Sequence, residues 1–99
     1  MNIQALMKQA QKMQNEVMKE KEAMDKEIFT ETYSNIIVEV SGSKEIKNIK
    51  ISKDMTLDSD DIEMLEDMLI IAINNAFKKV DKETEKRFGK YGNGLSGLL

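Results

Sequence analysis

The sequence predicts an α+β protein with the element order α-β-β-β-α, in which two long helices flank a three-stranded antiparallel meander. Three observations lead to this fold class. Residues 1–27 carry a heptad pattern of apolar side chains, residues 28–52 contain short runs in which apolar and polar side chains alternate, and a second helical pattern begins near residue 60. Heptad spacing is typical of helices, and strict alternation is typical of half-buried strands.

The first helix is predicted from apolar residues that recur at intervals of three and four, with one break at Glu20. Neither Gly nor Pro interrupts this stretch, and most of the intervening residues are good helix formers. The apolar seam consists of Ile3, Leu6, Ala10, Met13, Val17 and Met24. This pattern predicts a helix that buries its seam against another helix or sheet.

Three short strands are predicted between the helices. The segment 29–33 is β-branched and aromatic, 36–40 alternates cleanly, and a third run carries Ile49 and Ile51 in phase. Ile46 is out of phase with those two, so we expect a bulge or the exit of a turn there. The turn candidates at 34–35 and 41–43 are short, which favours an antiparallel meander.

The second helix is predicted from about Ser59 or Asp60 to about Arg87, with Asp60 and Glu63 spaced as in a capping box. Its middle is apolar over most of the circumference, whereas a surface helix normally has one apolar stripe. We therefore expect a belt of side chains that packs on the sheet and holds a second copy of the chain. The belt consists of Met64, Leu65, Met68, Leu69, Ile71 and Ile73.

The amino-acid composition argues against several classes of function. The 99 residues form a single domain with net charge −3, and they include no Cys, which excludes disulfides and thiol chemistry. The chain also lacks His, the usual general base and a common metal ligand, and it has no glycine-rich phosphate loop. We expect no enzyme activity, no cofactor, no metal and no small-molecule substrate. No apolar run is long enough to span a membrane, so we expect a cytoplasmic protein without a membrane partner.

Four segments resemble the YbaB/EbfC family of bacterial nucleoid-associated DNA-binding proteins. They are LMKQAQKMQ at 6–14, VEVSG at 38–42, IKIS at 49–52 and, most specifically, EMLEDMLIIAINNA at 63–76. The resemblance implies the same α-β-β-β-α order, a tweezer-like homodimer with protruding helices, and binding of double-stranded DNA in the nucleoid. It covers residues 1–88 as the DNA-binding domain. Residues 89–99 are predicted to form a glycine-rich flexible tail.

Charge is segregated along the chain, and the predicted helix ends are basic. If they protrude as the family implies, they can neutralise phosphates and release counterions, which gives affinity that depends on salt and little on sequence. A single arginine in the chain argues against extensive reading of guanine. The candidate DNA-binding residues are Lys8, Lys12, Lys19, Lys78, Lys79, Lys82, Lys86, Arg87 and Lys90.

Three alternatives remain open at this point. The lysines late in the second helix also oppose the helix dipole favourably, so the charge runs can be a solvated face. Heptad helices around a small meander are also consistent with a prefoldin-like holdase for unfolded proteins. A third possibility is a dimerisation adaptor that docks a partner through Leu95, Leu98 and Leu99 of the tail.

Overall fold

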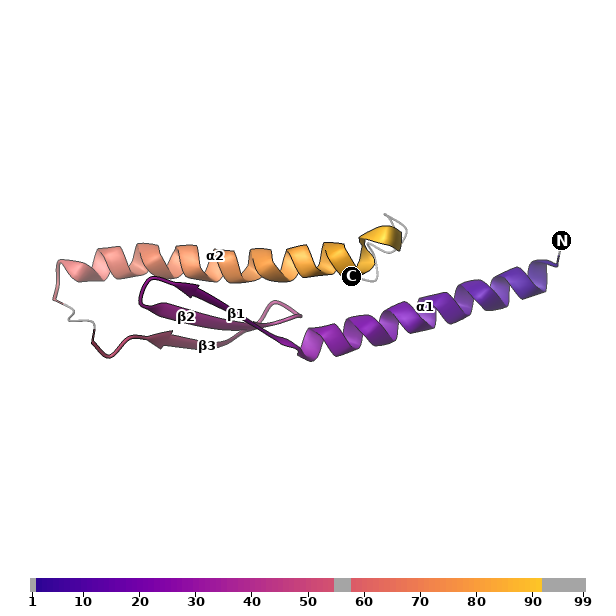
Figure 1. The fold of residues 1–99 in the computed structure, drawn as a ribbon, viewed down its shortest axis with the longest axis horizontal. Coiled ribbons are helices and arrows are strands. Elements are labelled where there is room, and N and C mark those ends of the chain that lie inside the picture. The colour runs from indigo at the N-terminus through magenta and orange to yellow at the C-terminus, as the bar shows by residue number, and fades with distance from the viewer. Residues whose placement is uncertain (1, 55–57, 92–99) are drawn as a thin grey trace.

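The computed structural model describes residues 2–54 and 58–91, and it confirms the predicted order of elements (Figure 1). The predicted boundaries agree with the observed ones to within a few residues. The elements are α1 (Ile3–Lys26), β1 (Ile28–Tyr33), β2 (Ile36–Ser41), β3 (Ile46–Ile51) and α2 (Asp61–Phe88). A short 3₁₀ turn at 89–91 follows α2, and the leucines of the predicted tail lie outside the described residues.

The three strands form one antiparallel sheet in the order β1-β2-β3, which is the predicted meander. Between β2 and β3 the register shifts, because Glu39 pairs with Asn48 while Val40 pairs with Ile46. Lys47 is therefore an extra residue on β3. This bulge explains why Ile46 is out of phase with the other apolar residues of the strand, as the sequence predicted.

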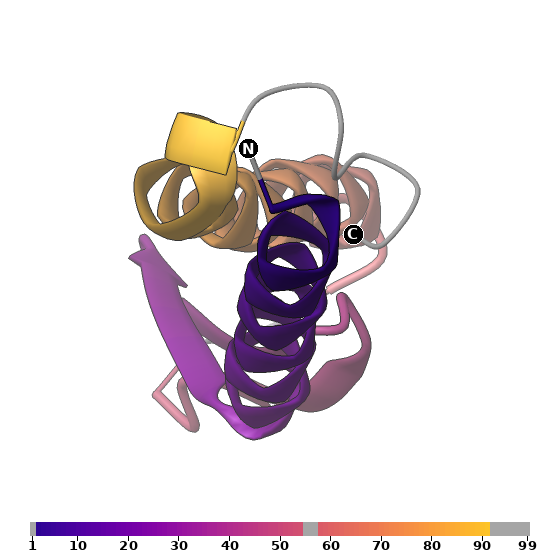
Figure 2. The ribbon, with the colours of Figure 1, turned by 90° about the vertical axis from the view of Figure 1, so that its right-hand side faces the viewer.

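Helix α2 lies lengthwise along one face of the sheet, as the view down the long axis shows (Figure 2). Every second residue of β2 is buried beneath it, and α2 contributes Ala72, Ala76 and Val80 to the same core. Two alanines at successive turns let the helix backbone approach the strands closely. The core thus sits between α2 and the central strand, and the edge strand β3 remains largely exposed.

The predicted apolar belt of α2 divides into two parts. Leu65, Met68, Leu69 and Ile73 are partly buried and pack against the core of their own chain. Met64 and Ile71 lie outside that contact, with 51% and 40% of their surface exposed. The two exposed residues are seven positions apart and so share one side of the helix.

Helix α1 projects from the end of the sheet (Figure 1). The chain measures 71 × 20 × 16 Å, and its radius of gyration of 19.3 Å exceeds the roughly 13 Å of a compact domain of this length. Only Val17 and Met24 of the α1 seam are buried. Ile3, at the far end, is 68% exposed. The protruding arrangement that the family resemblance implies is therefore seen for α1.

The predicted capping box at Asp60 is wrong. Asp60 has a helical backbone (φ −78°, ψ −22°), and its side chain makes no capping hydrogen bond. The turn before α2 is stabilised instead by Asp58, whose carboxylate accepts from the Asp60 amide at 2.9 Å, and by Asp61, whose carboxylate accepts from the Asp58 amide at 3.3 Å. Within the described ranges, neither helix is sufficiently long and apolar to cross a membrane.

Candidate nucleic-acid interface

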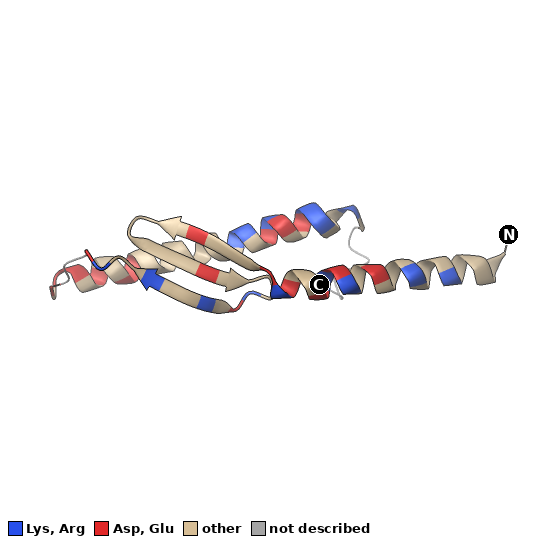
Figure 3. Ribbon diagram, turned by 60° about the horizontal axis from the view of Figure 1, so that its bottom comes forward, with Lys and Arg blue, Asp and Glu red and all other residues tan. Residues whose placement is uncertain are grey.

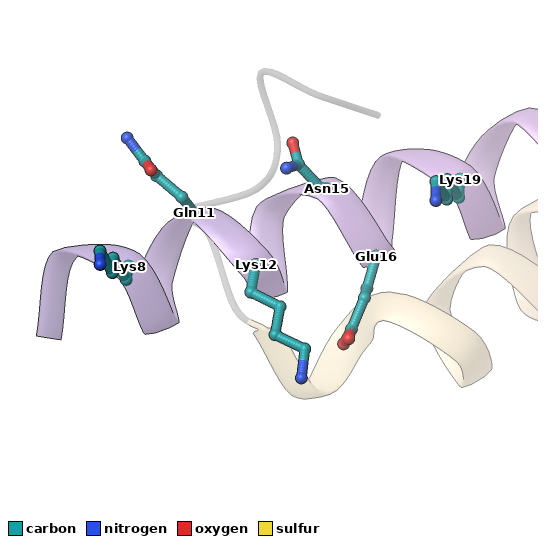
Figure 4. Close-up of a pocket in the computed structure, with 6 residues that line it drawn as sticks. All are labelled: Lys8, Gln11, Lys12, Asn15, Glu16 and Lys19. Carbon is teal, nitrogen blue, oxygen red and sulfur yellow. The ribbon is translucent and has the colours of Figure 1, made fainter. Parts of the chain in front are cut away.

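The first basic surface is on α1, and we call it the α1 basic face. Lys8, Lys12 and Lys19 are exposed on the side of the helix opposite the apolar seam, since Lys12 follows Ala10 by two residues and so by about 200°. They line a shallow hollow together with the side chains of Gln11, Asn15 and Glu16. In Figure 4, Gln11 and Asn15 point to one side of this hollow, and Lys12 and Glu16 point to the other.

The second basic surface is on the C-terminal half of α2, beside β1. Lys78, Lys79 and Lys82 line a hollow there together with Asn75 and with Glu31 of β1. Lys86 follows one turn later on the same side of the helix and is exposed. We call Lys78, Lys82 and Lys86 the α2 basic face. Within the described ranges, none of these three lysines is in an ion pair.

Lys79 differs from its neighbours because its ammonium group is bound within the chain. Its Nζ donates to the backbone oxygen of Thr30 at 2.7 Å and lies 3.9 Å from the carboxylate of Glu31. This side chain therefore ties α2 to β1. A phosphate would reach Lys79 only in competition with the bond to Thr30.

Arg87 is also bound within the chain. Its Nη2 lies 2.8 Å from the carboxylate of Glu27, and its Nε donates to Glu83 at 2.8 Å. The hydrogen bond to Glu27, and next the one to Glu83, raise the pKa of the guanidinium above its ordinary value. The predicted DNA-binding arginine thus already bonds two carboxylates.

The last predicted basic residue, Lys90, lies in the 3₁₀ turn, with its Nζ 5.1 Å from the centre of the Tyr91 ring. The sequence had not singled out Lys44. Its Nζ lies 2.9 Å from a carboxylate oxygen of Asp81 and 5.7 Å from the centre of the Phe77 ring. Lys44 thereby joins the turn between β2 and β3 to α2.

Charge is separated along the long axis of the molecule. Acidic residues cluster around the start of α2. Lysines are interspersed with acids on its C-terminal half and on the second half of α1, and the N-terminal half of α1 carries lysines without acids (Figure 3). Among the residues that the structure describes, no group of three or more potential metal ligands lies close enough together to hold an ion. Phosphate groups would be repelled at this end and attracted toward the overhanging helices.

Sequence reasoning missed the amide side chains beside the lysines. Gln11 and Asn15 on α1, and Asn75 on α2, line the same hollows as the basic residues. Side-chain amides donate to phosphate and sugar oxygens. The signal was present in the spacing, since residues three and four positions apart on a helix are neighbours.

The family assignment follows from comparison with known proteins. The model of the YbaB/EbfC DNA-binding family matches residues 1–95. The chain belongs to this family. Membership confirms the resemblance found in the sequence, and it agrees with the prediction that the chain is not an enzyme, since this is a family of DNA-binding proteins.

Several bacterial proteins match this chain over most of their length. A nucleoid-associated protein of Enterococcus faecalis is 40% identical over 98% of this chain and 94% of its own. A protein of the same name from Ligilactobacillus salivarius is 34% identical over 99% of this chain and 95% of its own. Another from Agathobacter rectalis is 40% identical over 99% of this chain and 88% of its own.

Proposed function

We propose that this member of the YbaB/EbfC family is a nucleoid-associated protein that binds double-stranded DNA as a homodimer, mainly through phosphate contacts from lysines. The observation that carries this proposal is the position of the two basic faces. Both lie on helices that extend from the same end of the sheet, away from the acidic start of α2 (Figures 1 and 3). Negative DNA would therefore approach the helices from that end.

The chemistry of the two faces favours binding with little dependence on sequence. Lysine is a point charge that pairs with phosphate. Recognition of guanine relies chiefly on bidentate hydrogen bonds from the guanidinium of arginine. The one arginine of the chain is held by Glu27 and Glu83. Binding would come mostly from counterion release, with Gln11, Asn15 and Asn75 adding hydrogen bonds to the sugar-phosphate backbone.

A homodimer is supported by the apolar surface that a single chain leaves uncovered. Met64 and Ile71 are exposed on one side of α2, and Ile62 and Ile70 are exposed on other parts of the same helix. Ile49 of the neighbouring edge strand is also partly uncovered. Apolar side chains left uncovered on one side of a helix, as Met64 and Ile71 are, fit an interaction site.

The salt dependence of binding tests the DNA proposal. We expect the affinity for a labelled duplex of about 30 base pairs, followed by fluorescence anisotropy, to fall linearly on a log-log plot against salt, with a slope of about −0.9 per phosphate contact. A duplex of scrambled sequence should bind almost equally well. Absence of binding even at low salt would contradict the proposal.

Replacing Ile71 by Asp tests the dimer. Because Ile71 does not pack on its own sheet, the variant should keep its helical circular dichroism but sediment as a monomer. Leu69→Asp is a less useful variant, since Leu69 packs against the core and its replacement also damages the monomer. Glu63→Gln, an exposed change on the same helix, should leave the dimer intact. If the Ile71 variant sediments as an unchanged dimer, the interface lies elsewhere.

A holdase is the second candidate, and the exposed seam of α1 is the observation that favours it. Ile3, Leu6 and Met13 form an apolar stripe that the described residues leave uncovered. Such a stripe is suited to transient contact with apolar segments of unfolded proteins. Suppression of the aggregation of an unfolded client, without affinity for DNA, would support this function in place of the first.

A further inference from the structure

The sequence assigned Arg87 to the DNA-binding surface, but its contacts indicate another role. The guanidinium bridges two carboxylates on different elements, and Glu27 is the residue at which α1 ends and the chain turns into β1. Glu27 has an extended backbone (φ −67°, ψ 147°), so the direction of α1 relative to the sheet is set at this residue. Arg87 thus fastens the end of α2 to the base of the projecting helix.

We propose that Arg87 is a positioning residue that fixes the direction of α1 and thereby places the α1 basic face relative to the α2 basic face. This inference rests on the proposed binding of DNA.

Other contacts where the end of α1 meets β1 and α2, a region that we call the joint, support this role. The amide of Gly42 donates to the backbone oxygen of Glu27 at 3.0 Å, so Glu27 is held through its main chain as well as its side chain. Met24, one turn earlier on α1, is fully buried, and the hydroxyl of Thr84 on α2 lies 4.0 Å from its sulfur. N-terminal to Met24, only Val17 of α1 is buried, so the direction of α1 depends on the contacts around Glu27 together with the one at Val17.

Because α1 is long, a small rotation at the joint displaces its far end by a large distance. Lys8 lies about 27 Å from the end of the helix at 1.5 Å per residue. A rotation of about 10° at the joint would therefore move Lys8 by about 5 Å, which exceeds the axial spacing of about 3.4 Å between phosphates on one strand. If the contacts of Arg87 are lost, even a small change in the direction of α1 would move its lysines out of register with the phosphates.

Replacing Glu27 by Gln distinguishes a positioning role from direct contact, because the two predict opposite signs. If Arg87 contacts DNA, removing its acidic partner frees the guanidinium and should tighten binding. If Arg87 positions α1, the same change should weaken binding by up to about fivefold. That factor corresponds to the largest contribution usually measured for an exposed ion pair. It should do so although the variant carries one negative charge fewer. Glu85→Gln, an exposed change of equal charge, should tighten binding slightly.

A second readout needs no DNA. The chain contains no Cys, so spin labels at Gln4→Cys and Asn74→Cys, both exposed, report the direction of α1 relative to α2 when labelled chains are diluted with unlabelled ones. We expect the distance distribution to broaden in both Glu27→Gln and Arg87→Gln. The salt slope of Arg87→Gln should equal that of Glu27→Gln, since both changes act on the direction of α1 and neither removes a phosphate contact made by Arg87 itself.

Several results would overturn the inference. These are tighter binding by Glu27→Gln, an unchanged distance distribution in both variants, or a salt slope that is shallower in Arg87→Gln than in Glu27→Gln by about 0.9 per site. Failure of the wild type to bind DNA would instead contradict the proposed function, while the distance measurement would still decide whether Arg87 orients α1.

Discussion

Reversing the charge of the α2 basic face, with Lys78, Lys82 and Lys86 all changed to Glu, should weaken binding of duplex DNA by at least about 100-fold at low salt. Each lost phosphate contact should also make the salt slope shallower by about 0.9. None of the three side chains is in an ion pair within the described ranges, so their replacement removes no salt bridge seen there. Anisotropy titrations over a salt series measure both quantities.

A matched variant distinguishes the effect of where the charges lie from the effect of the net charge. Lys47, Lys50 and Lys53 are exposed on or just after β3, and changing all three to Glu alters the net charge by the same amount, although it also removes the exposed ion pair of Lys47 with Glu45. This control should bind DNA far more tightly than the α2 variant. If both lose the same affinity, net charge governs binding and the α2 basic face is not the contact. Thermal melts followed by circular dichroism should show that both variants are folded, since each acid placed late in a helix costs about 0.3–1 kcal/mol.

Gly42→Ala should have the largest effect on stability and lower the free energy of unfolding by about 3 kcal/mol. A Cβ atom at this position would lie 1.9 Å from the backbone oxygen of Met24 and 2.6 Å from its carbonyl carbon. Both are main-chain atoms of α1, so the helix or the β2–β3 turn must move. That movement would also break the hydrogen bond from the Gly42 amide to Glu27. Urea unfolding at one fixed protein concentration measures the change.

Gly89→Ala is the control for that measurement. A Cβ atom there would come within 2.6 Å of a carboxylate oxygen of Glu85, but this is the end of a flexible side chain that can turn aside. We expect its stability to stay within about 1 kcal/mol of the wild type. Equal stability of the two glycine variants would show that the approach of Met24 to the β2–β3 turn does not constrain the fold.

The elements of the fold could be predicted from sequence because each rests on a local signal. The heptad of α1, the alternation in β2 and even the bulge near Ile46 follow from the spacing of apolar residues a few positions apart. Capping at Asp60 failed because several acidic residues compete for the same turn. Asp58 and Asp61 make the hydrogen bonds there, and spacing alone does not reveal which carboxylate will do so.

The candidate site could be predicted only in part. Lysines grouped by helical spacing do share faces on α1 and α2, but the partners of Arg87 and Lys79 could not be foreseen. Glu27 and Thr30 are far from them in sequence, and they are brought close only when α2 packs on the sheet. For the same reason the apolar stripes of α2 could be identified from periodicity, whereas the sequence could not tell that Leu69 is covered by its own sheet and Ile71 is not.

The bulge at Lys47 bears on how the protein avoids aggregation. An edge strand with unpaired backbone groups is a template on which another chain can add a strand. On β3 the bulge interrupts the regular row of donors and acceptors, and Lys50 places positive charge along the same edge, where Lys47 pairs with Glu45. Two copies brought together edge to edge would meet mismatched hydrogen bonds and like charges. The irregularity of β3 therefore makes this edge a poor template for pairing with a strand of another chain.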